Sequence, residues 1–344
     1  MDCKNLDDFL SSSKITVYLT HRSGRIFLKS EQKIVIQDDL NNSTILNLDK
    51  IRRIVMIGRL ADVDSNIFYR CMIKKIPIDF LDIKGNSQGQ LLFDNNDCEY
   101  YIEQQNRLSY EAALSFAKSL VITKICNCKE VIRRRISHDK LFNLQFHKCR
   151  VSLAPTLEQI RGEEGFAARK YFQIWKSILG DDYFSSRQMH PSPDPVNSLL
   201  SFGYTLLRNR MTSALKSAGL NPRIGFFHAQ RGRHCALSSD LMEQFRPYVD
   251  TTVMSLFNRK QLSSDNFKVS ENSNMCFLAD SESFRKVIHS FEDMFTKIYP
   301  AYFGYDSNFR FCRRSLNDML DDTAENYAYM LQNKANFCTW RISA

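Results

Sequence analysis

Short runs of β-branched and aromatic residues occupy most of the first hundred positions, and turn-forming residues such as Ser23 and Gly24 separate them. Runs of this kind are typical of strands in a small β-rich domain. Strands are predicted over residues 16–20, 25–29, 33–37, 44–48, 52–57 and 78–81. A helix is predicted over residues 64–75, before the last of these strands.

From residue 108 the apolar positions recur every three or four residues, which is the period of a helix. The first such stripe predicts one long helix and consists of Leu114, Ala117, Val121, Ile125, Cys128 and Ile132. Further helices are predicted over residues 156–179, 195–218, 240–257, 281–298 and 315–331. We therefore expect an α+β fold, with a β-rich domain over residues 1–100 and a larger all-α domain over residues 101–344. A polar stretch at residues 95–107 marks the expected boundary.

The charge of the chain favours a polyanionic partner. Lysine and arginine outnumber the acidic residues by 47 to 38, which gives a net charge of +9. The basic residues cluster around positions 124–135 and again around positions 208–233. Clustering of this kind makes nucleic-acid binding a better explanation for the basic residues than an ordinary solvated surface.

The apolar runs and the cysteines exclude two classes of protein. No apolar run approaches the length of a membrane span, and residues 1–13 are mixed polar and acidic rather than a secretory signal, so we expect a cytoplasmic protein. The ten cysteines are scattered, and the one close pair, Cys126 and Cys128, has the spacing of neither a zinc site nor a redox site. We expect reduced thiols.

One glutamate stands on the apolar face of the helix predicted over residues 156–179. The stripe consists of Leu157, Ile160, Ala168, Tyr171, Trp175 and Ile178. Glu164 falls on it, whereas Glu163 falls among polar positions and is expected to face solvent. An ionised carboxylate on an apolar face is costly without a cation or a donor. The alternative is an ordinary ion pair with an arginine of a neighbouring helix.

Two glycines, Gly162 and Gly165, bracket this glutamate. A glycine inside a helix costs about 1 kcal/mol relative to alanine. We therefore expect another group to approach the backbone closely at this point.

A histidine and two further acids follow a predicted loop over residues 223–238. His228 comes after two phenylalanines, so its imidazole is expected to be half-buried, although a hydrogen-bonded core histidine would look the same. His234 is the competing imidazole and is expected to be exposed. Asp240 and Glu243 are spaced by three, which puts them on one helix face. Capping of the helix is the alternative explanation for this acidic pair.

Carboxylates together with one imidazole make an oxygen-rich site that suits Mg²⁺ or Mn²⁺ better than zinc. At these residues the sequence resembles the CRISPR adaptation integrase family, Cas one. The similar segments are GEEGFAARKYF at 162–172, DPVNSLLSFGY at 194–204, GFFH at 225–228 and DLMEQFRP at 240–247. They follow the order and spacing of the family's glutamate, central-helix, histidine and aspartate motifs. The strand pattern, with IVMIG at 54–58 and IPIDFLD at 76–82, fits the family's β-domain.

The resemblance implies a set of site residues. The family's catalytic metal ligands correspond to Glu164, His228 and Asp240, with Glu243 at a fourth acidic position that assists in some members, and the implied cofactor is Mg²⁺ or Mn²⁺. The residues expected to bind DNA are Asn197, Tyr204, Arg208, Arg231 and Arg233. The first three follow the polar line of their helix, for which a plain helix surface is the alternative.

The resemblance also implies an activity and partners. The expected protein is a metal-dependent DNA endonuclease and integrase that inserts short DNA fragments, called spacers, into a CRISPR repeat array by 3′-hydroxyl transesterification. It would act as a homodimer on double-stranded and branched DNA, together with a dimer of the small partner protein Cas two. Residues 1–100 would serve dimerisation and partner contacts, and residues 101–344 catalysis.

Two alternatives remain open. One is a transposon-type integrase of the same superfamily, which is disfavoured because little chain follows residue 331. The other is a non-catalytic nucleic-acid-binding scaffold, in which Glu164 forms a salt bridge and Asp240 caps a helix.

Overall fold

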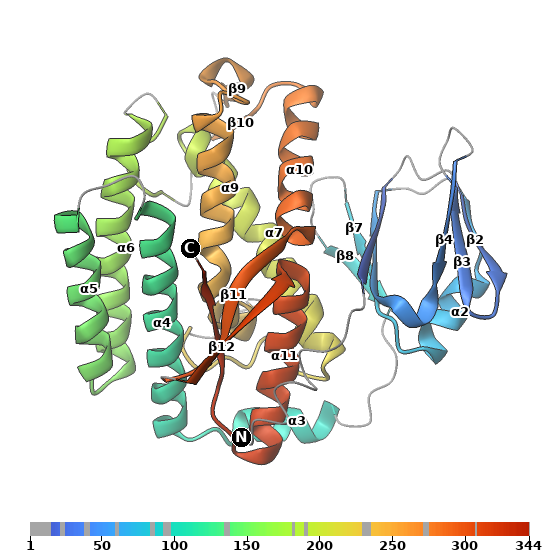
Figure 1. Cartoon of the computed structure of the whole chain (residues 1–344), viewed down its shortest axis with the longest axis horizontal. Coiled ribbons are helices and arrows are strands. Elements are labelled where there is room, and N and C mark those ends of the chain that lie inside the picture. Colours follow the sequence, from blue (N-terminus) through green and yellow to red (C-terminus); the bar gives the residue numbers. More distant parts are fainter. Residues whose placement is uncertain are drawn as a thin grey trace. The chain divides into compact units, whose positions relative to one another are not determined.

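The computed structural model describes residues 15–343 except 21–24, 38–41, 59–61, 83–86, 92–97, 134–137, 181–182, 189–191, 229–234, 271–274 and 307. The chain divides into two compact units (Figure 1). Unit 1 consists of Met1–Glu103 and Thr212–Asn221, and unit 2 consists of Gln104–Met211 and Pro222–Ala344. The expected α+β fold, a β-rich part followed by a mostly helical part, is confirmed.

Unit 1 holds two four-stranded sheets. Six of the eight strands lie within a residue of the predicted ones, whereas β6 and β8 were not predicted. The first sheet has the order β1-β5-β7-β8, in which only β8 is antiparallel to its neighbour. Its strands are β1 (Ile15–Thr20), β5 (Ile51–Ile57), β7 (Ile78–Leu81) and β8 (Ser87–Leu91). The second sheet has the order β4-β3-β2-β6. Its strands are β4 (Ser43–Asn47), β3 (Lys33–Gln37), β2 (Arg25–Ser30) and β6 (Asp62–Val63). Helix α2 (Asn66–Ile73) and the single turn η1 (Leu48–Lys50) complete the unit.

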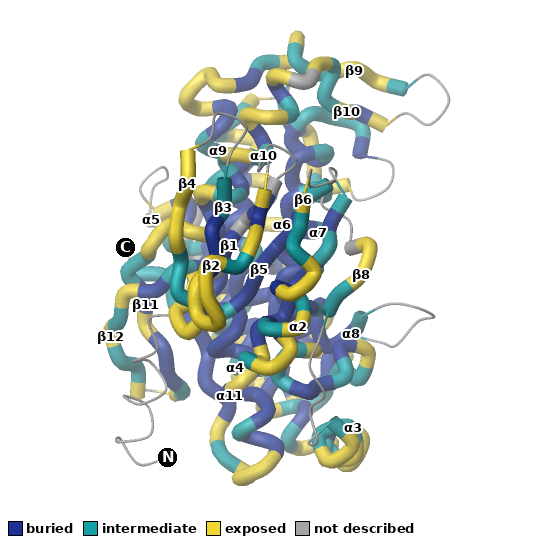
Figure 2. The backbone as a smooth tube through the Cα atoms, turned by 90° about the vertical axis from the view of Figure 1, so that its right-hand side faces the viewer, coloured by how far each residue is buried: buried dark blue, intermediate teal, exposed yellow. Residues whose placement is uncertain are grey.

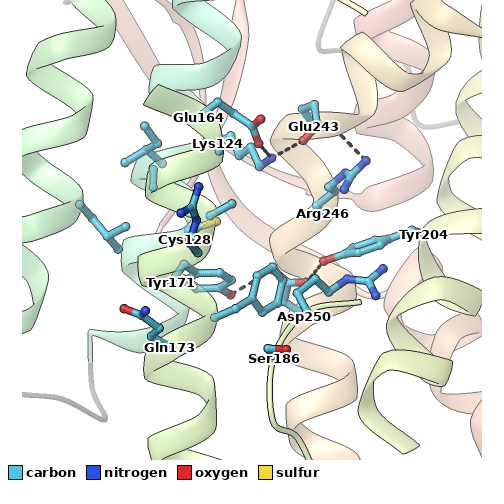
Figure 3. A pocket seen from close by; sticks show the side chains of 18 of the residues that line it. Lys124, Cys128, Glu164, Tyr171, Gln173, Ser186, Tyr204, Glu243, Arg246 and Asp250 are labelled. Atoms are coloured by element: carbon cyan, nitrogen blue, oxygen red, sulfur yellow. Dashed lines mark hydrogen bonds and ion pairs between the residues drawn. The ribbon is translucent and has the colours of Figure 1, made fainter. Parts of the chain in front are cut away.

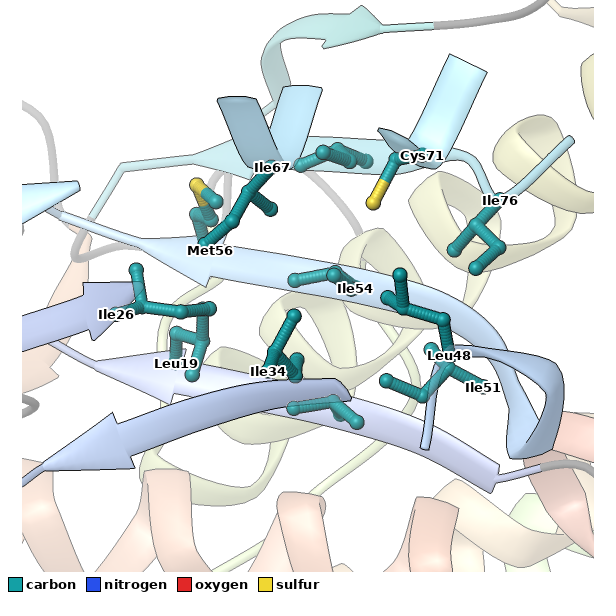
Figure 4. Packing of buried hydrophobic residues seen from close by; sticks show 12 residues of the cluster. Leu19, Ile26, Ile34, Leu48, Ile51, Ile54, Met56, Ile67, Cys71 and Ile76 are labelled. Carbon is teal, nitrogen blue, oxygen red and sulfur yellow. The ribbon is translucent and has the colours of Figure 1, made fainter. Parts of the chain in front are cut away.

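The core of unit 1 is a cluster of aliphatic side chains that point toward one another (Figure 4). Leu19 of β1, Ile34 of β3, Ile54 of β5 and Ile67 of α2 are all fully buried. Each fully buried side chain of this size stabilises the fold by roughly 1.5 to 3 kcal/mol. Because these residues come from different strands and from α2, their burial fixes both the register of the strands and the position of the helix.

Unit 2 is built mainly from helices. They are α4 (Tyr110–Ile132), α5 (His138–Leu153), α6 (Leu157–Leu179), α7 (Pro195–Ser217, whose last turn groups with unit 1), α8 (Ala236–Met242), α9 (Arg246–Asn258), α10 (Ser281–Thr296) and α11 (Leu316–Asn333). A further helix, α3 (Cys98–Asn106), runs across the boundary between the units. Helices α4, α5 and α6 lie side by side (Figure 1). Helix α11 is buried along most of its length (Figure 2).

The expectation of an all-α second part needs one addition, because unit 2 also contains strands. Strands β9 (Phe267–Val269) and β10 (Cys276–Leu278) pair with each other, and β12 (Asn308–Ser315), β11 (Ile298–Tyr305) and β13 (Thr339–Ile342) form a sheet in that order. Near the β11–β12 turn a Cβ on Gly304 would lie 1.9 Å from the carbonyl oxygen of Asn308, so the hairpin requires glycine there.

The single helix predicted over residues 240–257 is interrupted. Helix α8 ends at Met242, a turn of 3-10 helix (η2, Glu243–Phe245) follows, and α9 begins at Arg246 with a proline in its first turn. Cys235 is the N-cap of α8, so Asp240 lies inside that helix and the interpretation of Asp240 as its cap is wrong.

A membrane-spanning helix is absent from the described residues, since none of their helices combines the necessary length and apolar character.

Candidate active site

A cavity of about 680 Å³ in unit 2 collects most of the residues singled out from the sequence (Figure 3). Its walls come from α4, α5, α6, α7, η2 and α9, together with residues 185–187 and His228. The polar side chains that line it include Lys124, Glu164, Arg187, Tyr204, His228, Glu243, Arg246 and Asp250. Segments separated by more than a hundred positions therefore meet in one pocket, which contains Glu164 and His228 but not Asp240, the third of the expected ligands.

Two carboxylates meet at Lys124. The ammonium of Lys124 contacts Oε1 of Glu164 and lies 2.6 Å from Oε2 of Glu243. On the other side of Glu243, Nη2 of Arg246 lies 2.9 Å from Oε1, and Nε2 of His228 lies 3.9 Å from the same oxygen. Carboxylate oxygens of Glu164 and Glu243 thus both point toward the ammonium group of Lys124 (Figure 3).

The charges in this cluster keep both Glu243 and Lys124 ionised. Burial alone would raise the pKa of Glu243, but Arg246, Lys124 and His228 lower this pKa to about 2. Burial alone would lower the pKa of Lys124, but Glu164 and Glu243 together raise it above its ordinary value. At neutral pH the pocket therefore holds buried negative charge that requires cations close by.

Asp240 lies behind His228 and does not line the pocket. Its side chain is fully buried. Oδ2 accepts the backbone N–H groups of Phe226 and Phe227 at 2.7 and 3.0 Å, and Oδ1 accepts the backbone N–H of His228 at 2.7 Å. Oδ1 also lies 2.7 Å from Nδ1 of His228. Asp240 therefore fixes the loop, and it makes Nδ1 the protonated nitrogen of His228, which leaves Nε2 for the pocket.

The imidazole of His228 is biased toward its charged form. Burial would lower its pKa, but the hydrogen bond to Asp240 and the charges of Glu243 and Asp240 outweigh burial and raise the pKa above 6.5. The side chain is 35% exposed, so solvent and ligands still reach it.

The residues around His228 explain the segment GFFH. A Cβ on Gly225 would lie 2.7 Å from Oδ2 of Asp240 and 2.8 Å from the backbone carbon of Ala236, so only glycine lets the loop close over the carboxylate. Phe227 is buried, and the guanidinium of Arg161 donates two hydrogen bonds to its carbonyl oxygen, at 2.7 and 3.0 Å. The loop is therefore anchored from α8 through Asp240 and from α6 through Arg161.

Glu163 contradicts the expectation that it faces solvent. It is only 8% exposed, with Oε2 2.8 Å from Nδ1 of His147 and Oε1 2.5 Å from Nε of Arg150. Burial would raise the pKa of Glu163, but these two partners lower it. Both partners belong to α5, a helix absent from the sequence-based prediction, and this helix covers the face that was expected to be exposed. Glu164, one position on, points into the pocket as expected.

The two glycines beside this pair contradict the expectation of a close approach. No described atom outside the local helix lies within 4 Å of where a Cβ would stand on Gly162 or Gly165. Gly165 lines the pocket, so the free space beside it is open to a ligand.

In another part of the same pocket, Asp250 accepts hydrogen bonds from two tyrosines (Figure 3). Tyr171 donates to Oδ2 at 3.0 Å and Tyr204 donates to Oδ1 at 2.5 Å. Burial raises the pKa of Asp250 to about 6 in spite of these bonds. The sequence analysis missed Asp250. The available signal was an acid within the otherwise apolar helix that follows Pro247.

The residues expected to bind DNA have different environments. Tyr204 lines the pocket, whereas Arg208 is half-buried on α7 and lies outside the pocket lining. Asn197 is fully buried: its Oδ1 accepts from Arg187 and from the backbone of Gln188, and its Nδ2 donates to the carbonyl of Ser186. The expectation that Asn197 faces DNA is therefore wrong, because its amide group is buried and holds residues 186–188 at the pocket edge. Arg231, Arg233 and His234 lie outside the described residues.

In the described part of the chain, no three histidine, cysteine or acidic side chains are already arranged around a metal position. The donor types at the pocket nevertheless suit a divalent ion. Oε2 of Glu243 is buried and accepts no well-aligned hydrogen bond from the described residues, although the ammonium of Lys124 is close. A second carboxylate and an imidazole nitrogen face the same space.

These features define a two-unit α+β protein whose helical unit carries a pocket that combines carboxylates, basic side chains and one histidine. The chain belongs to the Cas1 family, because the family model described as CRISPR associated protein Cas1 matches residues 17–293.

Named relatives of the chain are endonucleases. The chain is 30% identical over 297 residues to a CRISPR-associated exonuclease Cas4/endonuclease Cas1 fusion of Geobacter sulfurreducens, covering 80% of this chain but only 52% of the fusion. It is 31% identical over 274 residues to CRISPR-associated endonuclease Cas1 1 of Chlorobaculum tepidum, covering 74% of this chain and 79% of that protein.

Solved structures share the fold. A chain of a partial Cas6-RT-Cas1–Cas2 complex superposes with a TM-score of 0.74 at 24% identity, covering 93% of this chain and 96% of the other. A casposase bound to integration product superposes with a TM-score of 0.65 at 20% identity, with the same coverage.

Proposed function

We propose that this chain is a divalent-metal-dependent DNA endonuclease and integrase that inserts short DNA fragments into a CRISPR repeat array by attack of a 3′-hydroxyl group. The observation that carries the proposal is the convergence of Glu164, His228 and Glu243 on one pocket. Membership of a family whose named members are endonucleases supports the same conclusion.

The geometry supports a change in the ligand set that the sequence resemblance implies. Glu243 faces the pocket and lies beside Nε2 of His228, whereas every oxygen of Asp240 is already engaged by the loop. We therefore assign Glu164, His228 and Glu243 as the residues that would hold Mg²⁺ or Mn²⁺, and Asp240 as the positioning residue for His228. This arrangement of a carboxylate behind a ligating histidine is common at metal sites.

The protein's own residues would prepare the phosphate for attack. When bound, the divalent ion supplies Lewis-acid chemistry, neutralising charge on the attacked phosphate and lowering the pKa of the incoming hydroxyl. Lys124 and Arg246 place two positive charges in the pocket, which would hold the DNA backbone without reading its sequence. The hydroxyl of Tyr204 is held by Asp250, so its ring forms a fixed wall beside Arg246.

The partners follow from relatives with the same fold. A neighbour of known structure is part of a complex with Cas2, and another is bound to an integration product. We propose that this chain acts as a homodimer with a dimer of Cas2 on double-stranded and branched DNA, with unit 1 providing dimerisation and partner contacts. A casposase-type transposon integrase is the second candidate, favoured by the fold similarity to the casposase.

The non-catalytic scaffold keeps one observation in its favour. Lys124 contacts both Glu164 and Glu243, so the two acids have a partner without any metal. These ion pairs alone would account for a purely structural role of Lys124, Glu164 and Glu243.

Binding of Mn²⁺, followed by electron paramagnetic resonance, separates these candidates. The catalytic proposal predicts one bound ion, with an affinity that falls at least about tenfold in Glu164→Gln and in Glu243→Gln. The exposed Glu158 at the start of α6 supplies the control, because Glu158→Gln removes an equal charge outside the pocket. No binding to the unaltered protein would favour the scaffold.

A further inference from the structure

The outer face of α5 and α6 carries two exposed phenylalanines that the pocket does not use. Phe146 of α5 is 50% exposed and Phe166 of α6 is 49% exposed. The ring of His147 lies between them, 5.5 Å from Phe146 and 6.0 Å from Phe166 between centroids, and it is stacked parallel to Phe166. The three rings form one continuous aromatic strip across two helices.

Each exposed ring has an arginine beside it. The guanidinium of Arg150 lies 5.7 Å from the ring centroid of Phe146, and that of Arg169 lies 5.0 Å from the centroid of Phe166. The side chain of Arg150 is 58% exposed, so its charge faces solvent. In each pair the guanidinium lies over the ring. Exposed aromatic rings and guanidinium planes are recognition elements for single-stranded nucleic acid, in which bases stack on either group and cations meet the backbone.

A buried acid holds this surface in place. Glu163 binds Nδ1 of His147 through one oxygen and Nε of Arg150 through the other. It therefore fixes the central ring and one guanidinium, and so links α6 to α5 beneath the two phenylalanines. Pre-ordering of side chains in this way reduces the entropy lost when a ligand binds.

The aromatic strip and the catalytic pocket share an edge. Gly165 and Arg169 line the pocket, and in sequence they flank Phe166 on α6. The space outside Gly162 and Gly165 is open. A strand whose end lies in the pocket can therefore pass over the α6 backbone onto the strip without meeting a side chain at either glycine.

We propose that Phe146, Phe166, Arg150 and Arg169, here called the aromatic platform, bind a single-stranded DNA segment that continues from the pocket, with a base stacked on each phenylalanine–arginine pair. The proposal deepens the proposed function, on which it rests for the direction of the strand. Duplex DNA fits less well because its bases are already stacked. A protein partner on the same face is an outcome that the tests below distinguish.

A cysteine within the platform provides a direct test on the unaltered protein. Cys149 lies between Phe146 and Arg150 on α5 and is the only exposed cysteine among those the structure describes. A single strand of about 16 nucleotides should slow its alkylation by N-ethylmaleimide about fivefold or more, read by peptide mass spectrometry, whereas a blunt duplex of equal length should protect it much less. An unchanged alkylation rate at a saturating concentration of single strand would overturn the proposal.

Loss of the two rings provides the second test. Single-strand affinity, measured by fluorescence anisotropy, should fall about fivefold or more for each ring removed by Phe146→Ala and Phe166→Ala. Tryptophan at both positions should retain binding. Phe277→Ala and Phe311→Ala are matched controls, since these rings are 48% and 57% exposed on strands outside α5 and α6, and they should leave binding within about twofold. An equal loss in the controls, or a changed oligomeric state in place of weaker DNA binding, would contradict the platform.

The pocket variant Glu164→Gln keeps the two proposals distinguishable. Without this carboxylate the strand-transfer activity should be lost, while protection of Cys149 by a single strand persists. A protein without any strand transfer but with protected Cys149 would refute the proposed function and leave the platform standing. Normal strand transfer with unprotected Cys149 would refute the platform alone.

Discussion

The pocket contains two buried carboxylates, seven positions apart, that behave in opposite ways. Glu243 has its pKa lowered to about 2, whereas Asp250 has its pKa raised to about 6. Both carboxylates lie in the buried interior, where burial raises the pKa. The difference lies in their nearest partners, because cations surround Glu243 and tyrosine hydroxyl groups bind Asp250.

The proposed function assigns the charge of Glu243 to metal binding, whereas Asp250 is a polar group that orders its neighbours. The negative charge at Glu243 is maintained at a site where a divalent ion would replace or join Lys124. Asp250 instead orients the rings of Tyr171 and Tyr204 in the wall of the cavity. The same pocket thus combines a charged part and a hydroxyl-bonded part.

Removal of the Lys124 ammonium group should destabilise the charged part of the pocket more than any other change considered. Lys124→Met leaves Glu164 and Glu243 without their common partner, although Arg246 still pairs with Glu243. Removal of one partner of a buried ion pair costs about 3 kcal/mol of unfolding free energy. Mn²⁺ should restore much of this stability, because binding to the folded state stabilises it. Urea unfolding with EDTA and with Mn²⁺ measures both effects. A variant as stable as the parent in EDTA would show that the cluster does not depend on Lys124.

The pH dependence of Asp250→Asn should reveal the raised pKa of Asp250. Since that pKa is about 6 in the folded protein and ordinarily 3.8, the folded state holds the proton more tightly. The stabilisation of the folded state by this bound proton is fully present below pH 3.8 and is lost as the pH rises through 6. From about pH 4 to about pH 7 the variant should therefore gain about 2 kcal/mol relative to the parent. A difference that does not change with pH would contradict this account.

Glu243→Gln should show the opposite sign in the same measurement. Because the pKa of Glu243 is lowered to about 2, its contribution is present above the ordinary value of 4.5 and is lost as the pH falls through that value toward 2. The cost of the substitution should therefore shrink on acidification, provided that the fold survives long enough for unfolding to be measured. A cost that grows at low pH would remove the distinction between the two carboxylates.

Tyr204→Phe is the mildest of these changes. It deletes the 2.5 Å hydrogen bond to Asp250 while the bond from Tyr171 remains. Loss of one hydrogen bond to a charged group should cost about 1.5 kcal/mol and should raise the pKa of Asp250 further, because this bond lowers it. A carboxyl titration followed by infrared spectroscopy would detect the shift. The corresponding Tyr183→Phe, at a ring outside the pocket, should leave the titration unchanged.

Much of the fold was predictable because local signals agree with burial. Helix α6 begins after Thr156, whose hydroxyl accepts the N–H of Gln159, and its apolar stripe continues to its end. Helix α5 was missed for a physical reason that also underlies the aromatic platform. Leu144 is buried but Phe146 and Leu153 are exposed, so the apolar residues of this helix do not form a single stripe.

The site was predictable only in part. An acid on an apolar face identified Glu164, and the aromatic flank identified His228. The roles of Asp240 and Glu243 could not be separated, because a spacing of three places both on one face of an uninterrupted helix. The interruption after Met242 and the loop that closes on Asp240 separate them in space. Pro247 and Gly225 mark these features locally, but neither shows which acid faces the pocket.

Strand transfer into a supercoiled plasmid that carries a CRISPR repeat tests the central claim most directly. With Mn²⁺ present, Glu164→Gln and Glu243→Gln should each lose about a hundredfold or more of the activity of the parent protein, while Glu158→Gln retains it. The control variant Glu158→Gln should also keep the DNA affinity and melting temperature of the parent protein. Full strand transfer by either Glu164→Gln or Glu243→Gln would contradict the assignment of these two carboxylates as metal ligands.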